Sequence, residues 1–128
     1  MTDLKDRKEI ATKVCDFVTE QKGMDTVLLD VSGNCSFADF FVISTVSSMG
    51  HLRGVVHELW GFLADQGLEV ADRHKSPDAD GWLLIDCGDI IIHLMSQEMR
   101  DFYNLEKLWS QSDRQIESFE APEISDEE

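Results

Sequence analysis

The feature that most constrains this chain is a pair of apolar, strand-like segments joined only by Gly88-Asp89. A two-residue loop with glycine first is typical of a type II′ hairpin. Because such a turn fixes the register, we expect Cys87 to pair with Ile90 and the remaining residues to follow in step. One face of this hairpin is wholly apolar and is predicted to lie in the core: Leu83, Ile85, Cys87, Ile90, Ile92 and Leu94.

The opposite face of the predicted hairpin mixes large apolar groups with a carboxylate and an imidazole. Two interpretations fit this mixture. An exposed patch of this kind is typical of a protein–protein contact. Alternatively, a helix covers the face, and His93 and Asp86 pair beneath it. The residues concerned are Trp82, Leu84, Asp86, Ile91, His93 and Met95.

The rest of the chain alternates between helical and strand periodicity. The element order predicts a single α/β domain over residues 1–109, with a mixed sheet of about five strands packed with helices. Residues 110–128 carry mostly acidic and few apolar side chains, which predicts an acidic mobile C-terminal tail. Helices are expected over residues 3–22, 49–66 and, after Ser96, 97–109; strands are expected over 26–31, 38–46, 68–72, 82–87 and 90–95.

The charge balance excludes several classes of partner. The chain has 26 acidic against 11 basic residues, a formal net charge of −15. With so few cations, the chain cannot displace many counterions from a phosphate backbone. We therefore expect it to bind neither DNA nor an anionic membrane surface. A basic protein is the favoured partner.

The cellular location follows from the same kind of argument. No apolar stretch approaches the length that spans a bilayer, and the N-terminal MTDLKDRKEI is too charged for a secretory signal. Cys15, Cys35 and Cys87 show no CxxC spacing, which is typical of reduced thiols. We therefore expect a cytoplasmic protein.

No residue constellation predicts a catalytic or metal site. His51 and His57 lie six residues apart, not at the i,i+4 spacing of helical zinc ligands. Asp86 and Asp89 flank the hairpin turn and could hold magnesium, but Asp89 is also a favourable turn residue. The chain has no Walker loop, GxGxxG or GxSxG motif, so no cofactor is expected.

Two sequence blocks together resemble the signatures of the ribosomal silencing factor family, also called Iojap-related proteins. The first block runs through Asp30, SFADFFVI at residues 36–43, Ser48 and His51. The second comprises Trp82, Leu84, Asp86, the GDIIIH stretch at residues 88–93, Arg100, Phe102-Tyr103 and LEKLW at residues 105–109.

This resemblance implies a fold and a function. The fold would have nucleotidyltransferase-like topology without enzymatic activity. The protein would bind the large ribosomal subunit through a small basic ribosomal protein on the intersubunit face. It would block joining of the small subunit, lower translation when nutrients are scarce, and form homodimers when free.

Together, the hairpin and the resemblance predict a partner-binding surface. Trp82 would be its apolar anchor, since aromatic residues dominate interface energetics, and Asp86 and Asp89 would meet cations of the basic partner. The alternative function is a metal-dependent, nucleotidyltransferase-like enzyme that uses these two carboxylates. The predicted surface consists of Trp82, Leu84, Asp86, Asp89, Ile91, His93, Arg100 and Tyr103.

Overall fold

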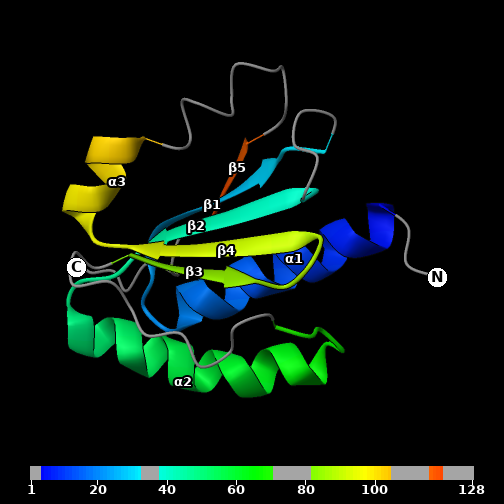
Figure 1. Cartoon of the computed structure of the whole chain (residues 1–128), viewed down its shortest axis with the longest axis horizontal. Coiled ribbons are helices and arrows are strands. Elements are labelled where there is room, and N and C mark those ends of the chain that lie inside the picture. Colours follow the sequence, from blue (N-terminus) through cyan, green and yellow to red (C-terminus); the bar gives the residue numbers. More distant parts are fainter. Residues whose placement is uncertain (1–3, 33–37, 71–81, 105–115, 120–128) are drawn as a thin grey trace, which may run out of the picture.

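The computed structural model describes residues 4–32, 38–70, 82–104 and 116–119 (Figure 1). A mixed sheet forms its centre, with the strand order β3-β4-β2-β1-β5. Strands β2 and β4 run parallel, and the other neighbouring pairs are antiparallel. The elements in chain order are α1 (Leu4–Glu20), β1 (Met24–Asp30), β2 (Phe40–Thr45), α2 (Met49–Asp65), β3 (Trp82–Asp86), β4 (Ile90–Met95), α3 (Gln97–Tyr103) and β5 (Ile116–Phe119).

The sheet has two apolar faces, and the helices divide between them (Figure 1). Helices α1 and α2 pack on one face, where Val14, Leu59 and the apolar hairpin side chains are fully buried. Helix α3 lies on the other side, where Met99 packs against a second buried cluster that includes Phe41 and Ile91. Strands β2 and β4 are buried along their whole length, because both of their faces are covered.

Local sequence signals set the ends of the helices. The side chains of Ser48 and Ser96 accept hydrogen bonds from the N–H groups of His51 and Met99, and so cap α2 and α3. Helix α3 ends at Asn104, which adopts a left-handed backbone with φ 48. In the described residues, no helix is long and apolar enough to cross a membrane.

The single α/β domain and four of the predicted strands are confirmed, but three details of the sequence interpretation are corrected. Residues 68–70 form no strand, and residues 71–72 lie outside the described residues. Helix α3 ends at the left-handed Asn104, whereas the sequence predicted a helix as far as residue 109. Residues 105–109 also lie outside the described part of the chain. The sheet gains β5 instead, from within the segment predicted to be a tail. The nucleotidyltransferase-like topology stays a prediction.

Candidate functional site

The β3–β4 hairpin forms as predicted. The first turn residue, Gly88, has φ 87, and the second, Asp89, keeps a negative φ, which matches a type II′ turn. The Cys87 N–H donates to the Ile90 carbonyl at 2.9 Å and closes the turn. The pairs Asp86–Ile91, Leu84–His93 and Trp82–Met95 follow in the expected register.

The imidazole of His93 is buried on the mixed face of the hairpin, for which the sequence allowed two interpretations. Its Nδ1 accepts a hydrogen bond from the Nε1–H of Trp82 at 3.3 Å, so the ring proton belongs on Nε2. Phe41 meets the imidazole edge-on, with ring centroids 4.9 Å apart. Burial lowers the pKa of His93 to about 4, so the ring is neutral near pH 7.

The pairing of His93 with Asp86, one of the two expected arrangements, is therefore replaced by a pairing with Trp82. Asp86 instead uses Oδ1 to accept the N–H of Gly88 at 2.9 Å, within the hairpin turn. The Nε2 atom of His93 is buried and has no hydrogen-bond partner in the described structure.

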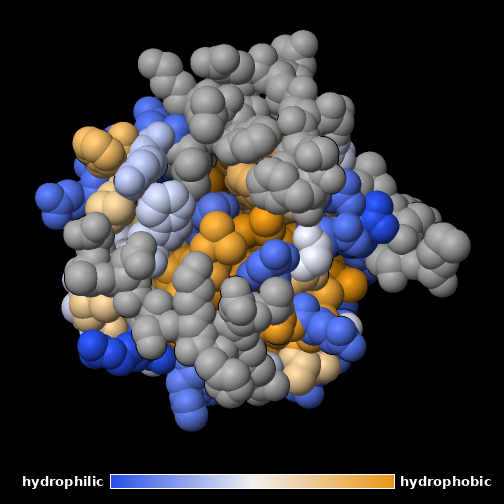
Figure 2. Space-filling model, viewed as in Figure 1, coloured by the Kyte–Doolittle hydropathy of each residue, from blue (hydrophilic) through white to orange (hydrophobic). Residues whose placement is uncertain are grey.

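An aromatic cluster extends from Trp82 to the end of α3. The rings of Trp82 and Tyr103 lie 4.8 Å apart, and Phe102 meets Tyr103 edge-on at 4.9 Å. Tyr103 is 46% exposed and Phe102 is 76% exposed, an unusual exposure for large apolar rings. Figure 2 shows apolar surface gathered in the middle of this view of the molecule.

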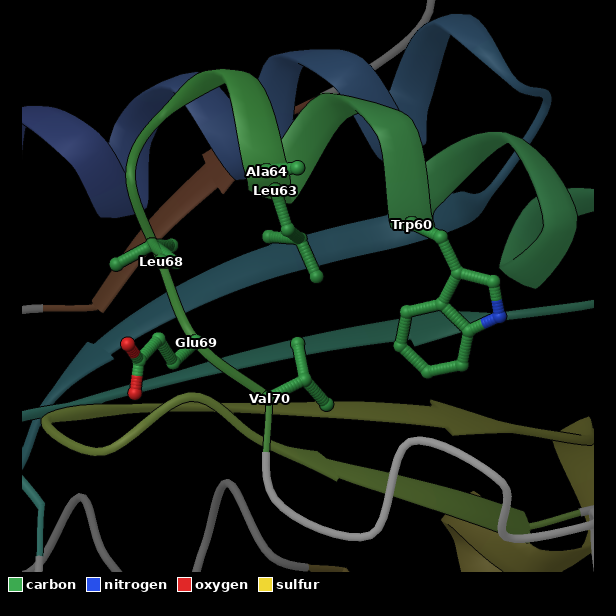
Figure 3. Close-up of a pocket in the computed structure, with 6 residues that line it drawn as sticks. All are labelled: Trp60, Leu63, Ala64, Leu68, Glu69 and Val70. Carbon is green, nitrogen blue, oxygen red and sulfur yellow. The ribbon is translucent and has the colours of Figure 1, made fainter.

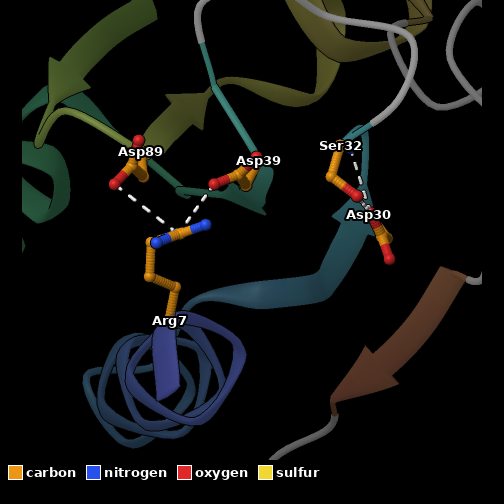
Figure 4. Close-up of polar contacts among 5 residues, drawn as sticks. All are labelled: Arg7, Asp30, Ser32, Asp39 and Asp89. Carbon is orange, nitrogen blue, oxygen red and sulfur yellow. Dashed lines mark hydrogen bonds and ion pairs between the residues drawn. The ribbon is translucent and has the colours of Figure 1, made fainter. Parts of the chain in front are cut away.

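An acidic corner lies at the other end of the hairpin (Figure 4). The Nε of Arg7, on α1, lies 2.7 Å from Oδ2 of Asp39 and 3.5 Å from Oδ2 of Asp89. The carbonyl of Asp89 also accepts the N–H groups of Asp39 at 2.8 Å and of Phe40 at 3.1 Å. This corner therefore fixes the hairpin turn to both α1 and the start of β2, while the Asp89 side chain stays 60% exposed.

Figure 4 also shows that Asp30 serves a local role at the end of β1: it accepts both the N–H and the hydroxyl of Ser32, at 3.0 and 2.7 Å. The carboxylates of Asp30, Asp86 and Asp89 thus already have partners within the chain. The described residues contain no group of three or more metal-ligating side chains. This geometry gives no support to the magnesium site considered for Asp86 and Asp89.

Arg100, predicted to face a partner, lies instead inside the protein and is only 6% exposed. Its Nη1 donates to Oγ1 of Thr45 at 2.8 Å and contacts the carbonyl of Met24 at 3.4 Å. The neighbouring Asp101 accepts a hydrogen bond from Gln97 at 2.8 Å. Arg100 therefore connects α3 to the adjoining ends of β1 and β2.

Two further features offer no chemistry. Burial, followed by the charge of Asp86, raises the pKa of the Cys87 thiol to about 12, so this thiol is no nucleophile. A pocket of about 340 Å³ at the end of α2 lies on the side of the sheet that α1 and α2 cover, opposite the aromatic cluster (Figure 3). It has one charged lining residue and five uncharged ones: Glu69, with Trp60, Leu63, Ala64, Leu68 and Val70.

Comparison with known proteins places this architecture in a family. The sequence profile of the family "Ribosomal silencing factor during starvation" (RsfS) matches residues 4–128. Ribosomal silencing factor RsfS of Halalkalibacterium halodurans is 33% identical over 102 residues, covering 80% of this chain and 86% of the relative. The corresponding protein of Treponema pallidum is 35% identical over 100 residues, covering 77% of this chain and 88% of the relative.

Solved structures agree with this assignment. A crystal structure from Bacillus halodurans superposes with a TM-score of 0.63 at 30% identity, covering 80% of this chain and 94% of that one. A Chromobacterium violaceum protein shows the same fold with a TM-score of 0.71 at 23% identity, covering 92% of this chain and 89% of that one. The fold and the sequence together define a regulatory protein of the ribosome. The chain belongs to the RsfS family of ribosomal silencing factors.

Proposed function

We propose that this protein is a cytoplasmic translational repressor that binds the large ribosomal subunit through a small basic ribosomal protein on the intersubunit face. Bound there, it sterically blocks joining of the small subunit, especially under nutrient limitation, and the free protein forms a homodimer. Family membership supports the proposal. A mouse relative, 33% identical over 97 residues, is named for mitochondrial assembly of the ribosomal large subunit.

The observation that carries the proposal is a hairpin face that combines aromatic rings with a carboxylate. The half-buried Trp82 contacts the exposed ring of Tyr103 at one end of this face, and Asp86 lies at the other end, next to the turn that carries Asp89. Aromatic anchors beside charged groups are typical of protein interfaces. The net charge of −15 favours a basic partner and should accelerate association at low salt.

The predicted site residues divide into two groups by burial. Those with accessible side chains make the contact: Trp82, Leu84, Asp86, Asp89 and Tyr103. Ile91, His93 and Arg100 are at most 6% exposed and support that surface from beneath.

Sedimentation with separated ribosomal subunits tests the proposal. The protein should pellet with large subunits and remain in the supernatant with small subunits or with assembled ribosomes. Binding should weaken as salt rises, since exposed charges are screened. Equal pelleting with both subunits would contradict the steric block.

Two substitutions locate the binding surface. Trp82→Ala and Asp86→Lys should each reduce large-subunit binding by about tenfold or more, which corresponds to roughly 1.4 kcal/mol, while the variants still melt cooperatively. Glu58→Lys is the matched control, because Glu58 is exposed on α2 and the substitution changes the charge by the same amount. If both hairpin variants bind normally, the interface lies elsewhere, and the first sequence block at residues 36–43 is tested next.

A further inference from the structure

Strand β3 forms one edge of the described sheet, with β4 on its inner side. The Cys87 N–H donates to Ile90 O, so Cys87 and Ile90 form a hydrogen-bonded pair. Antiparallel ladders alternate between hydrogen-bonded and non-hydrogen-bonded pairs. In this register, Asp86–Ile91 and Leu84–His93 are non-hydrogen-bonded pairs.

The main-chain N–H and C=O groups of Leu84 and Asp86 must therefore point away from β4, toward the open edge. Among the described residues, no backbone hydrogen bond outside the ladder satisfies them. The Asp86 side chain accepts the N–H of Gly88 within the turn and leaves the main-chain groups of Asp86 free in the described structure. Unpaired main-chain groups in a row are a template for a further strand.

Within the described residues, this edge has neither proline, lysine nor a bulge among the devices that prevent strand addition. The sequence WLLID contains neither proline nor lysine, and its pairing with β4 runs without a register shift. By contrast, the β1–β2 pair has an irregularity between Met24 and Val27. A regular, unprotected edge strand is either a hazard or a binding site.

The side chains of the same residues indicate what kind of strand fits. Trp82, Leu84 and Asp86 alternate onto the face that carries the aromatic cluster, and all three are half-buried. The Trp82 end lies against Tyr103, whereas the other end carries the half-buried carboxylate of Asp86. An added strand would meet apolar groups at one end and negative charge at the other.

We propose that the outer edge of β3 accepts an extended basic segment of the protein partner as an additional strand of the sheet. Main-chain hydrogen bonds to Leu84 and Asp86 supply affinity, and alternate side chains supply specificity. The segment carries an apolar residue near Trp82 and a lysine or arginine near Asp86. This inference rests on the proposed function, because it describes how the basic ribosomal protein would be held.

Leu84→Pro tests the edge directly. Proline removes the outward N–H of residue 84 but no hydrogen bond of the β3–β4 ladder, so it is tolerated at such a position. Leu84→Ala is the matched control, because it shortens the same side chain and keeps the N–H. In sedimentation with large subunits, Leu84→Pro should lose at least about tenfold more affinity than Leu84→Ala. Equal binding by the two variants would overturn the proposal.

Hydrogen exchange on the wild-type protein covers the case in which Leu84→Pro fails to fold. Exchange measured by mass spectrometry should slow across residues 82–86 when large subunits are added. Unchanged exchange in a sample that does bind subunits would overturn the added strand and leave the proposed function standing.

If the wild-type protein binds no subunits, the proposed function fails, and a synthetic peptide decides the edge alone. This peptide carries valine and lysine four positions apart, so that both lie on one face of a strand, opposite Trp82 and Asp86. Slower exchange across residues 82–86 with this peptide supports the proposal, and unchanged exchange overturns it. Leu84→Pro could also abolish a homodimer of the free protein while leaving subunit binding intact. That result would show that a second copy of the chain occupies the edge, and it would overturn the proposal.

Discussion

The Nε1–H of Trp82 donates to Nδ1 of His93 across a diagonal of the hairpin, at 3.3 Å. Trp82 pairs directly with Met95, and His93 with Leu84, so the hydrogen bond joins two neighbouring cross-strand pairs. It fixes the half-buried indole of the proposed anchor to a buried, neutral imidazole. The surface that would meet the partner is thus held from beneath by a polar group.

The burial of His93 predicts a pH-dependent stability. Its pKa falls from 6.5 to about 4 on folding, so between these two pH values the unfolded chain binds a proton that the folded chain does not. The contribution of His93 to the free energy of unfolding is therefore complete above the unfolded pKa and is lost as the pH falls toward the folded pKa. The loss should approach roughly 3 kcal/mol.

Urea titrations across this pH range measure that slope. His93→Asn removes the titrating group, so its stability should change much less with pH than that of the wild type. His57→Asn is the matched control, because it makes the same replacement at an exposed position on α2. An identical slope in the wild type and in His93→Asn would show that another group is responsible.

The sequence predicted the hairpin in detail because the information is local. Period-two alternation and a glycine-first turn fix the register without reference to the rest of the fold. Which element covers the opposite face of the hairpin depends on distant parts of the chain. The sequence therefore left two interpretations of that face open. The structure gives a third arrangement, in which Ile91 and Met95 are buried, Trp82 is half-buried, and His93 bonds to Trp82 rather than to Asp86.

Contacts between distant segments were invisible to the sequence interpretation. Arg7 and Asp39 lie 32 positions apart, and nothing in either local pattern indicates their ion pair. Residues 68–70 alternate like a strand, yet Leu68 and Val70 pack beside α2 against the core instead. Strand β5 was missed because its segment is mostly polar, and its pairing with β1 is a tertiary contact.

Gly23 allows close approach between the end of α1 and β2. A Cβ at this position would lie 2.4 Å from Oγ of Ser44 and 2.7 Å from Cγ1 of Val18. Gly23→Ala should therefore lower the free energy of unfolding by about 2 kcal/mol, a typical cost of overpacking. Gly54→Ala is the matched control within α2, where a Cβ meets nothing within 4 Å. It should stabilise by about 0.5 to 1 kcal/mol. Equal effects in chemical denaturation would contradict this account.

Arg7 should contribute modestly to stability, because its ion pairs are partly exposed. Arg7→Gln is expected to lower the free energy of unfolding by about 1 kcal/mol. A double-mutant cycle with Asp39→Asn should give a larger coupling energy than one with Asp89→Asn, since the two distances are 2.7 and 3.5 Å. Arg53→Gln on the exposed face of α2 is the control and should be nearly neutral. A reversed order of couplings would show that Asp89 is the principal partner.

Arg100 should act on partner binding through the position of α3 rather than by contact. Arg100→Met keeps the apolar stem but leaves the Thr45 hydroxyl and the Met24 carbonyl without the guanidinium. The expected cost is about 2 kcal/mol of unfolding free energy. Affinity for large subunits should fall as well, because Tyr103 loses its fixed position against Trp82.

Arg100→Lys separates this indirect role from direct contact. A lysine keeps the charge but lacks the guanidinium fork, so it should recover part of the stability and part of the affinity together. Urea denaturation and subunit sedimentation on the same preparations measure both quantities. If Arg100→Met lost affinity at unchanged stability, the guanidinium would itself reach the partner, and the buried position seen in the free protein would have to open on binding.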